Sequence, residues 1–423
     1  MPDKSVGLSI FGASLFVYGG VMLGRLVAIL RETSIATLYG LSSTADIVVF
    51  ALFLSDLVVL TLATSSLGKV VIAELKHAPE NQRSQIFVST LVSSFLFFSV
   101  VALLLGLFSR DIVEIGLSSI PLASRDAVAN VLAISVWSFP FSAATVVIAA
   151  YLESERKFQL SSWRPALFNM AVLAAVIASS NNLELFSYLL PLSAFAVFAI
   201  FVVMVRVSVF RFNGGLVRLN KQIAKPYLSG IAIAVLNAVP FFFPYFVAGR
   251  LEPGDVTAYN FAYKLILFPI GLAALMFDVV VYPDMARRSA EGGVGFGKRL
   301  GNLLVMVVVG TILLTIGLYF TAEPLVALVF GYGDMGSAQI DRVAKFLSVG
   351  ILGMPFYVIG SAALSNFLSR RQHKKALTMS IVTALVMIAA CLNFSSSTGA
   401  LGLMYAFLIM SIVRALIGLG LIK

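Results

Sequence analysis

The sequence predicts an all-α polytopic membrane protein with twelve transmembrane helices in two pseudo-symmetric six-helix bundles around a central cavity. Three observations predict this fold. Of the 423 residues, 60% are hydrophobic and only 12% are charged, which excludes an ordinary soluble domain. Apolar stretches long enough to cross a bilayer recur from one end of the chain to the other. Finally, two similar segments lie about half a chain apart, which indicates an internal repeat.

The apolar stretches give the order of the elements. They are long and continuous rather than short and alternating, so they favour helices over a membrane β-barrel. The first stretch is too long for the core of a signal peptide and is predicted to be a retained span. The predicted spans cover residues 6–30, 42–72, 84–109, 127–152, 160–180, 184–206, 225–249, 257–283, 299–321, 342–369, 376–394 and 399–421.

Charged residues in the predicted loops set the orientation. Loops after the even-numbered spans carry seventeen Lys and Arg residues, whereas loops after the odd-numbered spans carry five, namely Arg31, Arg110, Arg125, Arg250 and Arg342. The positive-inside rule therefore predicts that both termini lie in the cytoplasm. The net charge of +10 is explained by these loops, so no nucleic acid is expected as a partner.

Few residues are available for metal or cysteine chemistry. Cys391 is the single cysteine, and the two histidines, His77 and His373, fall in predicted loops. This excludes an intramolecular disulfide and leaves almost no material for a catalytic triad or a zinc site. No predicted loop exceeds about twenty residues, so a soluble catalytic domain has no room. We expect no cofactor and no enzymatic activity.

An internal repeat divides the chain. "LAISVWSFPF" at 132–141 and "LSVGILGMPF" at 347–356 both place Pro-Phe eight residues after a Leu. A similar offset relates Asp46 of the second span to Asn260 of the eighth. The pattern predicts an N-terminal six-helix bundle over 1–206, a basic cytoplasmic linker over 207–224 and a C-terminal six-helix bundle over 225–423.

Three basic residues within or directly after predicted spans are candidates for binding an anion. Arg25 and Arg31 lie near the outer end of the first span, and Lys264 lies well inside the eighth. Burying such a charge costs about 2.5–3.5 kcal/mol, so it normally faces protein or water. Arg25 and Arg31 could instead snorkel to the outer headgroups. Pro269 interrupts the eighth span, as is typical where a helix lines a cavity.

The intramembrane carboxylates have two open interpretations. Asp46, Asp56 and Asp278 could each pair with a basic residue or carry a coupling proton or cation. For Asp46 we expect a pair with Arg25 or Arg31. Asp278 is open to capture by Arg287 or Arg288, or to a role in coupling.

A sequence motif runs from the end of the first predicted span into the second. "GRLVAILRETSIATLYGLSSTADIVVFAL" at 24–52 resembles the start of the bacterial lipid II flippases of the MviN/MurJ family, which belong to the multidrug/oligosaccharidyl-lipid/polysaccharide exporter superfamily. Arg25, Arg31, Gly40 and Asp46 stand at the places of that pattern. "YNFAYKLILFPIGL" at 259–272 is similar to the family's eighth span, with Lys264 where an essential arginine usually stands.

Further motifs extend the resemblance over most of the chain. "FGYGDM" at 330–335 and "ERKFQLSSWRPALFN" at 155–169 resemble two connections of the family. The chain departs from the pattern at Val59 or Leu60, where the family has an arginine. It also has twelve predicted spans, whereas the family typically has two more.

The resemblance implies a flippase that carries an undecaprenyl-pyrophosphate-linked oligosaccharide from the inner to the outer leaflet by alternating access. Arg25, Arg31 and Lys264 would hold the pyrophosphate, with Asp46 at the same site, and Asp46 or Asp278 would couple a proton or sodium ion. The cargo is either lipid II or an exopolysaccharide or O-antigen precursor, and a polysaccharide polymerase stays open as a partner beside the membrane lipids. The alternatives are a cation-coupled multidrug antiporter of the same superfamily and a membrane polysaccharide polymerase or ligase.

Overall fold

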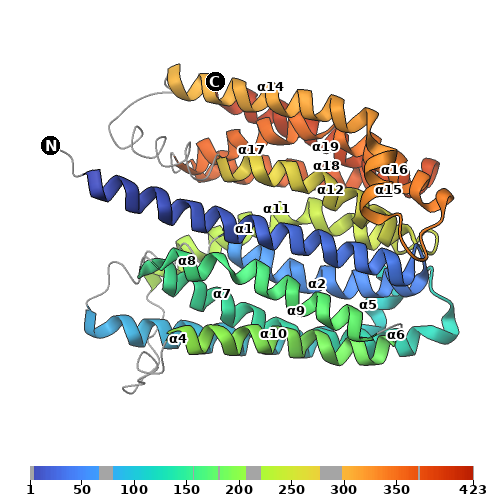
Figure 1. Cartoon of the computed structure of the whole chain (residues 1–423), viewed down its shortest axis with the longest axis horizontal. Helices are drawn as coiled ribbons and strands as arrows, with labels where there is room; N and C mark the ends of the chain where they lie inside the picture. Colours follow the sequence, from blue (N-terminus) through green and yellow to red (C-terminus); the bar gives the residue numbers. More distant parts are fainter. Residues whose placement is uncertain are drawn as a thin grey trace. The chain divides into compact units, whose positions relative to one another are not determined.

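The computed structural model describes residues 4–65, 80–155, 157–179, 182–205, 221–276, 298–369 and 372–422. These residues form helices joined by turns and short connections, without a strand among them (Figure 1). A helix satisfies its backbone hydrogen bonds internally, which a chain inside a bilayer requires. The predicted linker over 207–224 lies outside the described residues, apart from the start of the helix at Lys221.

The contacts within the chain divide it into two units. Unit 1 consists of Met1–Tyr39 and Ile47–Val235, and unit 2 consists of Gly40–Asp46 and Leu236–Lys423. The short segment Gly40–Asp46 therefore belongs to unit 2, although the chain on both sides of it belongs to unit 1. We describe each unit by itself.

Unit 1 is a bundle of long helices. Its helix α1 packs on α8 and α9, and α7 packs on both α4 and α10. Phe87, Ile148 and Phe201 meet in the core that these last three helices share. The helices are α1 (Lys4–Tyr39), α2 (Ser43–Ser65), α4 (Glu80–Leu107), α5 (Ser109–Gly116), α6 (Leu122–Ser135), α7 (Ser138–Ser154), α8 (Phe158–Ser162), α9 (Arg164–Ser179), α10 (Leu183–Val205) and the first part of α11 (Lys221–Ala248).

Unit 2 is a second helical bundle. Its helix α19 packs on α16, α17 and α18, and α12 packs on α16. The rings of Phe261 and Phe330 stack with centroids 4.5 Å apart in its core. Its further helices are α12 (Asp255–Met276), α14 (Lys298–Phe320), α15 (Ala322–Phe330), α16 (Ser337–Ile351), α17 (Met354–Ser369), α18 (His373–Thr398) and α19 (Leu401–Ile422).

Each predicted span falls on one helix or on consecutive helices, as far as the structure describes it. The predicted end of the first span at residue 30 is wrong, because α1 continues to Tyr39. Six helices of the described residues are long and apolar enough to cross a membrane, and the number is up to eight if each of two bent pairs is one span. In one pair Ser337–Ile351 and Met354–Leu368 meet at 46°, and in the other Val305–Phe320 and Ala322–Phe330 meet at 76°. The short helices α5 and α15 were not predicted.

The repeated motif marks a helix break in each unit. Helix α6 ends at Ser135 and α7 starts at Ser138, while α16 ends at Ile351 and α17 starts at Met354. Proline stands just inside the second helix both times, at Pro140 and Pro355. A proline has no N–H for the preceding turn, so the helix is interrupted there. The two motifs thus both mark a break between consecutive helices, and the bend at the second break is 46°.

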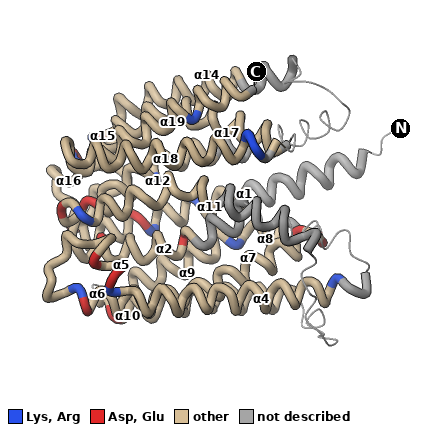
Figure 2. The backbone as a smooth tube through the Cα atoms, turned by 180° about the vertical axis from the view of Figure 1, so that it is seen from behind, with Lys and Arg blue, Asp and Glu red and all other residues tan. Residues whose placement is uncertain are grey.

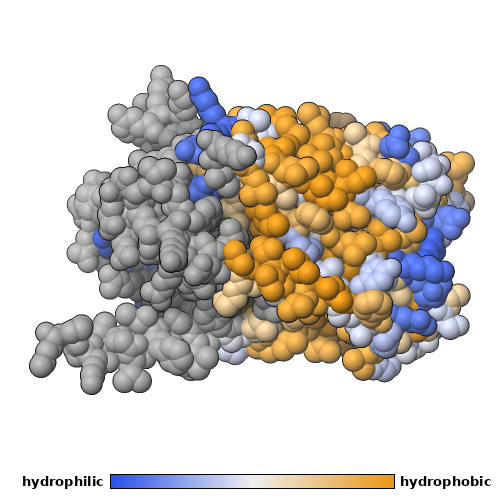
Figure 3. All heavy atoms as spheres, turned by 90° about the horizontal axis from the view of Figure 1, so that it is seen from above, coloured by the Kyte–Doolittle hydropathy of each residue, from blue (hydrophilic) through white to orange (hydrophobic). Residues whose placement is uncertain are grey.

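Large apolar side chains cover the outside of several helices. On α14 the exposed residues Val305, Val309, Leu313 and Ile316 follow one another at helical spacing. Apolar side chains fill much of the described face in Figure 3. Charged residues of the described part gather toward the helix ends (Figure 2). This distribution fits a protein surface surrounded by lipid rather than water.

Candidate functional site

Arg31 is enclosed within unit 1, with 1% of its surface exposed. Its Nη2 contacts two carboxylates, Glu32 Oε1 at 2.6 Å and Asp56 Oδ2 at 3.4 Å. Its Nη1 donates a 3.0 Å hydrogen bond to Oδ1 of Asn169. A buried arginine is tolerated when several acceptors surround it, as here. The side chain does not reach the surface, so the snorkelling alternative is wrong for Arg31.

Asn169 also fixes the backbone of α1 against α9. Its Nδ2 donates to the carbonyl oxygens of Gly24, at 3.2 Å, and of Pro165, at 2.9 Å. A Cβ atom added at Gly24 would lie 2.9 Å from Cβ of Pro165. Only a glycine lets the two helices approach this closely. The position of Arg25, the next residue, follows from this contact.

Arg25 is partly exposed, in contrast to Arg31. The two residues are six apart on α1, which separates their directions by about 120° around an ideal helix. Arg25 thus leaves the helix on a different side from the Arg31 cluster. Of the two arginines, Arg25 is the one with exposed surface.

Asp46 has other partners than predicted. Its Oδ1 accepts from N of Thr257 at 2.8 Å and from Oγ1 of Thr257 at 2.7 Å, and its Oδ2 accepts from N of Gly254 at 2.7 Å. The expected pair with Arg25 or Arg31 is therefore wrong. The first N–H groups of a helix lack partners within it, and Asp46 satisfies them at the start of α12. This long-range cap explains why a carboxylate with 1% exposure is stable there.

The rest of the segment Gly40–Asp46 is also tied into unit 2. N of Leu41 donates to Oε1 of Gln339 on α16 at 3.3 Å. Gly40 ends α1 with φ of +57°, and a Cβ atom there would lie 2.9 Å from the carbonyl oxygen of Asp334. A residue with a side chain is strained in this conformation, so the tight turn needs glycine.

Lys264 lies on α12 between Tyr263 and Leu265, which are both buried, and its own side chain is partly exposed. It belongs to unit 2 together with Asp46, whereas Arg25 and Arg31 belong to unit 1.

Asp278 lies outside the described residues. Within the described part of the chain, no group of three His, Cys, Asp or Glu residues could hold a metal ion.

Two features were missed from the sequence. The cap between Asp46 and Thr257 joins residues 211 positions apart, and no local pattern signals such a contact. Arg414 is buried in α19 with 4% exposure. It stands within the predicted span 399–421, so the rule that charges inside spans are functional candidates applied to it as well.

A sequence model of the family described as "Lipid II flippase MurJ" matches residues 35–423. The lipid II flippase MurJ of Burkholderia cenocepacia is 22% identical over 413 residues, which cover 90% of this chain and 77% of the relative. A probable lipid II flippase MurJ of Vibrio cholerae is 20% identical over 443 residues, covering 98% and 84%.

Solved structures share the fold. A structure of lipid II flippase MurJ in an inward closed conformation matches with a TM-score of 0.85 at 16% identity, over 97% of this chain and 87% of that chain. An inward-facing multidrug resistance MATE family transporter of the MOP superfamily matches with a TM-score of 0.74 at 12% identity, over 93% of both chains. The predicted fold class is therefore confirmed.

Proposed function

Because this chain belongs to the lipid II flippase MurJ family, we propose that it flips an undecaprenyl-pyrophosphate-linked oligosaccharide from the inner to the outer leaflet of the bacterial inner membrane. The observation that carries the proposal is the family match, which extends over residues 35–423. The long apolar helices support a multi-pass membrane protein. The proposed orientation, with both termini in the cytoplasm, rests on the positive loops alone.

The proposed cargo class is supported by the names of the relatives and by the chemistry of a lipid-linked sugar. Relatives from two organisms are named lipid II flippases. A lipid-linked sugar with a pyrophosphate is bulky and anionic, so it cannot cross hydrocarbon unaided. Lipid II is the first choice, and an exopolysaccharide or O-antigen precursor with the same linkage is the second.

Arg25 and Lys264 are the proposed contacts to the pyrophosphate. Both side chains are partly exposed, so a ligand can reach them. Charge-assisted hydrogen bonds from such groups are about twice as strong as neutral ones. Arg31 and Asp46 are each 1% exposed and already bonded, which favours positioning roles. Arg31 would hold α1 in place beside Arg25, and Asp46 would hold the start of α12, the helix of Lys264.

The proposed movement is alternating access by the two units. Solved transporters of this fold include inward-facing and outward-facing conformations. With the cell interior negative, moving about two negative charges outward gains about 4–5 kcal/mol per 100 mV. The membrane potential could therefore drive export. Return of the empty carrier by protonation or cation binding at Asp46 or Asp278 is the alternative source of coupling.

The test is to delete the gene and measure which lipid-linked sugar accumulates in the inner leaflet. Accumulation of one such precursor, reversed by the wild-type gene, is the expected result. Drug sensitivity without any accumulation would favour the multidrug antiporter. A precursor that reaches the outer leaflet but is not polymerised would favour the polymerase or ligase.

A further inference from the structure

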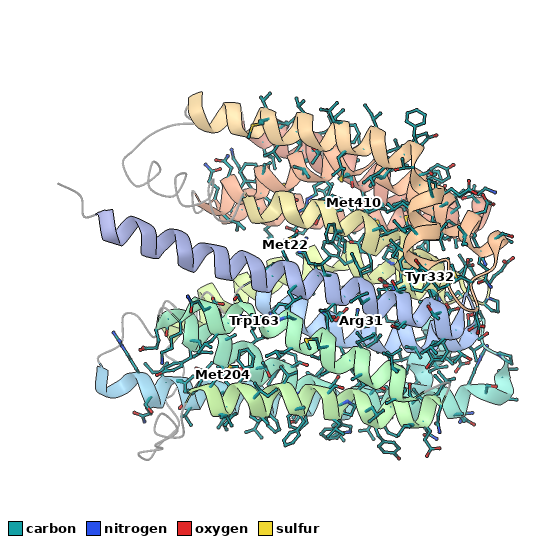
Figure 4. The ribbon with its side chains drawn as sticks, viewed as in Figure 1. Met22, Arg31, Trp163, Met204, Tyr332 and Met410 are labelled. Atoms are coloured by element: carbon teal, nitrogen blue, oxygen red, sulfur yellow. The ribbon has the colours of Figure 1, made fainter. Side chains whose placement is uncertain are left out.

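Arg414 occupies a place in unit 2 that is shaped for it. It lies on α19 one turn after Met410, which is labelled in Figure 4. Helices α17 and α19 pack side by side (Figure 1). A Cβ atom at Gly360 of α17 would lie 2.6 Å from Cγ of Arg414. The glycine therefore leaves room for the stem of the arginine.

The positive charge of Arg414 is not balanced by the residues that the structure describes. Its Nε has no hydrogen-bond partner, and no described carboxylate forms an ion pair with it. Its Cζ lies 4.9 Å from the centroid of the Tyr357 ring. A cation–π contact offsets only part of the cost of burying a charge. A negative partner beside the guanidinium would offset the rest of this cost.

Two buried hydroxyl groups in the same core also lack partners. Tyr259 and Tyr263 are 0% and 2% exposed. The Oη atom of each is buried and has no hydrogen-bond partner. The hydroxyl of Tyr245 differs, since it donates to Oδ1 of Asn260 at 2.7 Å. Buried polar groups in proteins nearly always have a partner, which is often a water or an ion.

Tyr263 and Arg414 each contact one ring of a packed pair. The ring of Phe407 meets Tyr263 edge-on at 5.7 Å and stacks on Tyr357 at 5.9 Å. Tyr357 in turn lies under the guanidinium of Arg414. The ring of Tyr259 stacks on Tyr263 at 5.4 Å. A guanidinium and two phenols supply hydrogen-bond donors, so the missing partner is an acceptor.

We propose that unit 2 binds a small monovalent inorganic anion of the halide class, held by Arg414 and Tyr263, with Tyr259 next to them. One guanidinium balances one negative charge. Phosphate or sulfate would bring a second charge and more oxygen acceptors than these donors satisfy. None of its residues is a proposed pyrophosphate contact, and this proposal does not depend on the proposed function.

The test uses the purified full chain in detergent, with chloride replaced stepwise by gluconate at constant ionic strength. The expected result is a Tm that rises with chloride and saturates, because a ligand that binds only the folded state stabilises it. Equilibrium binding of radioactive chloride should give one site per chain. Arg414→Gln should abolish both effects. No saturable binding to the wild-type chain would overturn the proposal.

Tyr263→Phe keeps the proposal testable if Arg414→Gln does not fold. This change keeps the ring and removes only the hydroxyl. With an anion bound there, the variant should lose chloride affinity several-fold, as expected for one hydrogen bond. If the hydroxyl has no partner, its removal should instead raise Tm equally in chloride and gluconate, which would contradict the proposal.

Two matched controls separate the site from general effects. Tyr245→Phe removes a hydroxyl that already has a partner, so chloride affinity should stay at the wild-type value. Arg110→Gln removes an arginine whose side chain is 75% exposed in unit 1, and it should also leave chloride affinity unchanged. A loss of affinity in either control as large as in Tyr263→Phe would refute the assignment.

Discussion

Arg31 on α1 and Asn169 on α9 are joined by a 3.0 Å hydrogen bond, and the same asparagine holds the carbonyl of Gly24. The bond links residues 138 positions apart in the chain. It places a buried guanidinium, two carboxylates and the backbone beside Arg25 in one rigid cluster.

Arg31→Gln should destabilise unit 1 by about 3–5 kcal/mol, because it leaves Glu32 without its cation in a buried position. Unfolding by denaturant in detergent micelles measures this change. Arg110→Gln is the matched control, since its pair with Asp126 is exposed and such pairs contribute about 0–1 kcal/mol. Equal losses of unfolding free energy in the two variants would show that the buried Arg31 cluster contributes no more stability than an exposed ion pair.

Gly24→Ala should cost about 1–3 kcal/mol, the usual range for forcing an extra group into a packed interface. The new Cβ would lie 2.9 Å from Cβ of Pro165, so α1 and α9 would have to separate. Gly19→Ala is the control on the same helix, because nothing lies within 4 Å of a Cβ atom there. Thermal unfolding of both variants gives the comparison, and a Gly24→Ala variant as stable as Gly19→Ala would be inconsistent with this packing.

Asp46→Asn should destabilise unit 2 by about 0.5–2 kcal/mol, as expected for loss of a helix cap. The amide of asparagine cannot accept all three hydrogen bonds that the carboxylate accepts. Asp341→Asn is the control, because that side chain is 52% exposed and bonded only to Lys345 on the same helix. If Asp46 served only as a pyrophosphate contact, its substitution would leave stability unchanged and alter transport alone.

Lys264→Arg should keep transport, whereas Lys264→Gln should lower its rate about tenfold to a hundredfold. The reason is that a hydrogen bond to a charged group contributes about 1.5–3 kcal/mol, and only arginine preserves the charge. Leaflet transfer of a labelled lipid-linked sugar in proteoliposomes measures the rate. Full activity of Lys264→Gln would remove this residue from the proposed site.

Hydropathy predicted the helices but not their partners. The spans follow from the length of apolar stretches, because the bilayer imposes that length on any helix that crosses it. The repeated motif predicted equivalent positions in the two halves, and the structure adds that both are helix breaks next to Pro140 and Pro355. The sequence pattern did not predict how strongly α14 bends against α15 or α16 against α17, at 76° and 46°.

The sequence predicted which residues are candidates for the site, but it did not predict what these residues contact. Charges inside apolar stretches are costly, so Arg25, Arg31 and Lys264 stand out in the sequence. Whether such a residue is enclosed or open to a ligand depends on which side of its helix faces the rest of the bundle. Arg31 proved to be enclosed and Arg25 partly exposed for this reason. The partners of Asp46 come from a helix 211 residues away, so its expected pair with an arginine was wrong.

The most direct test of the central claim is the rate at which purified protein moves labelled lipid II between the leaflets of a proteoliposome. We predict transfer well above that of protein-free vesicles, and a rate near the protein-free value for a folded double variant, Arg25→Gln with Lys264→Gln. Wild-type vesicles that transfer the labelled lipid no faster than protein-free vesicles, with the protein correctly folded, would contradict the account.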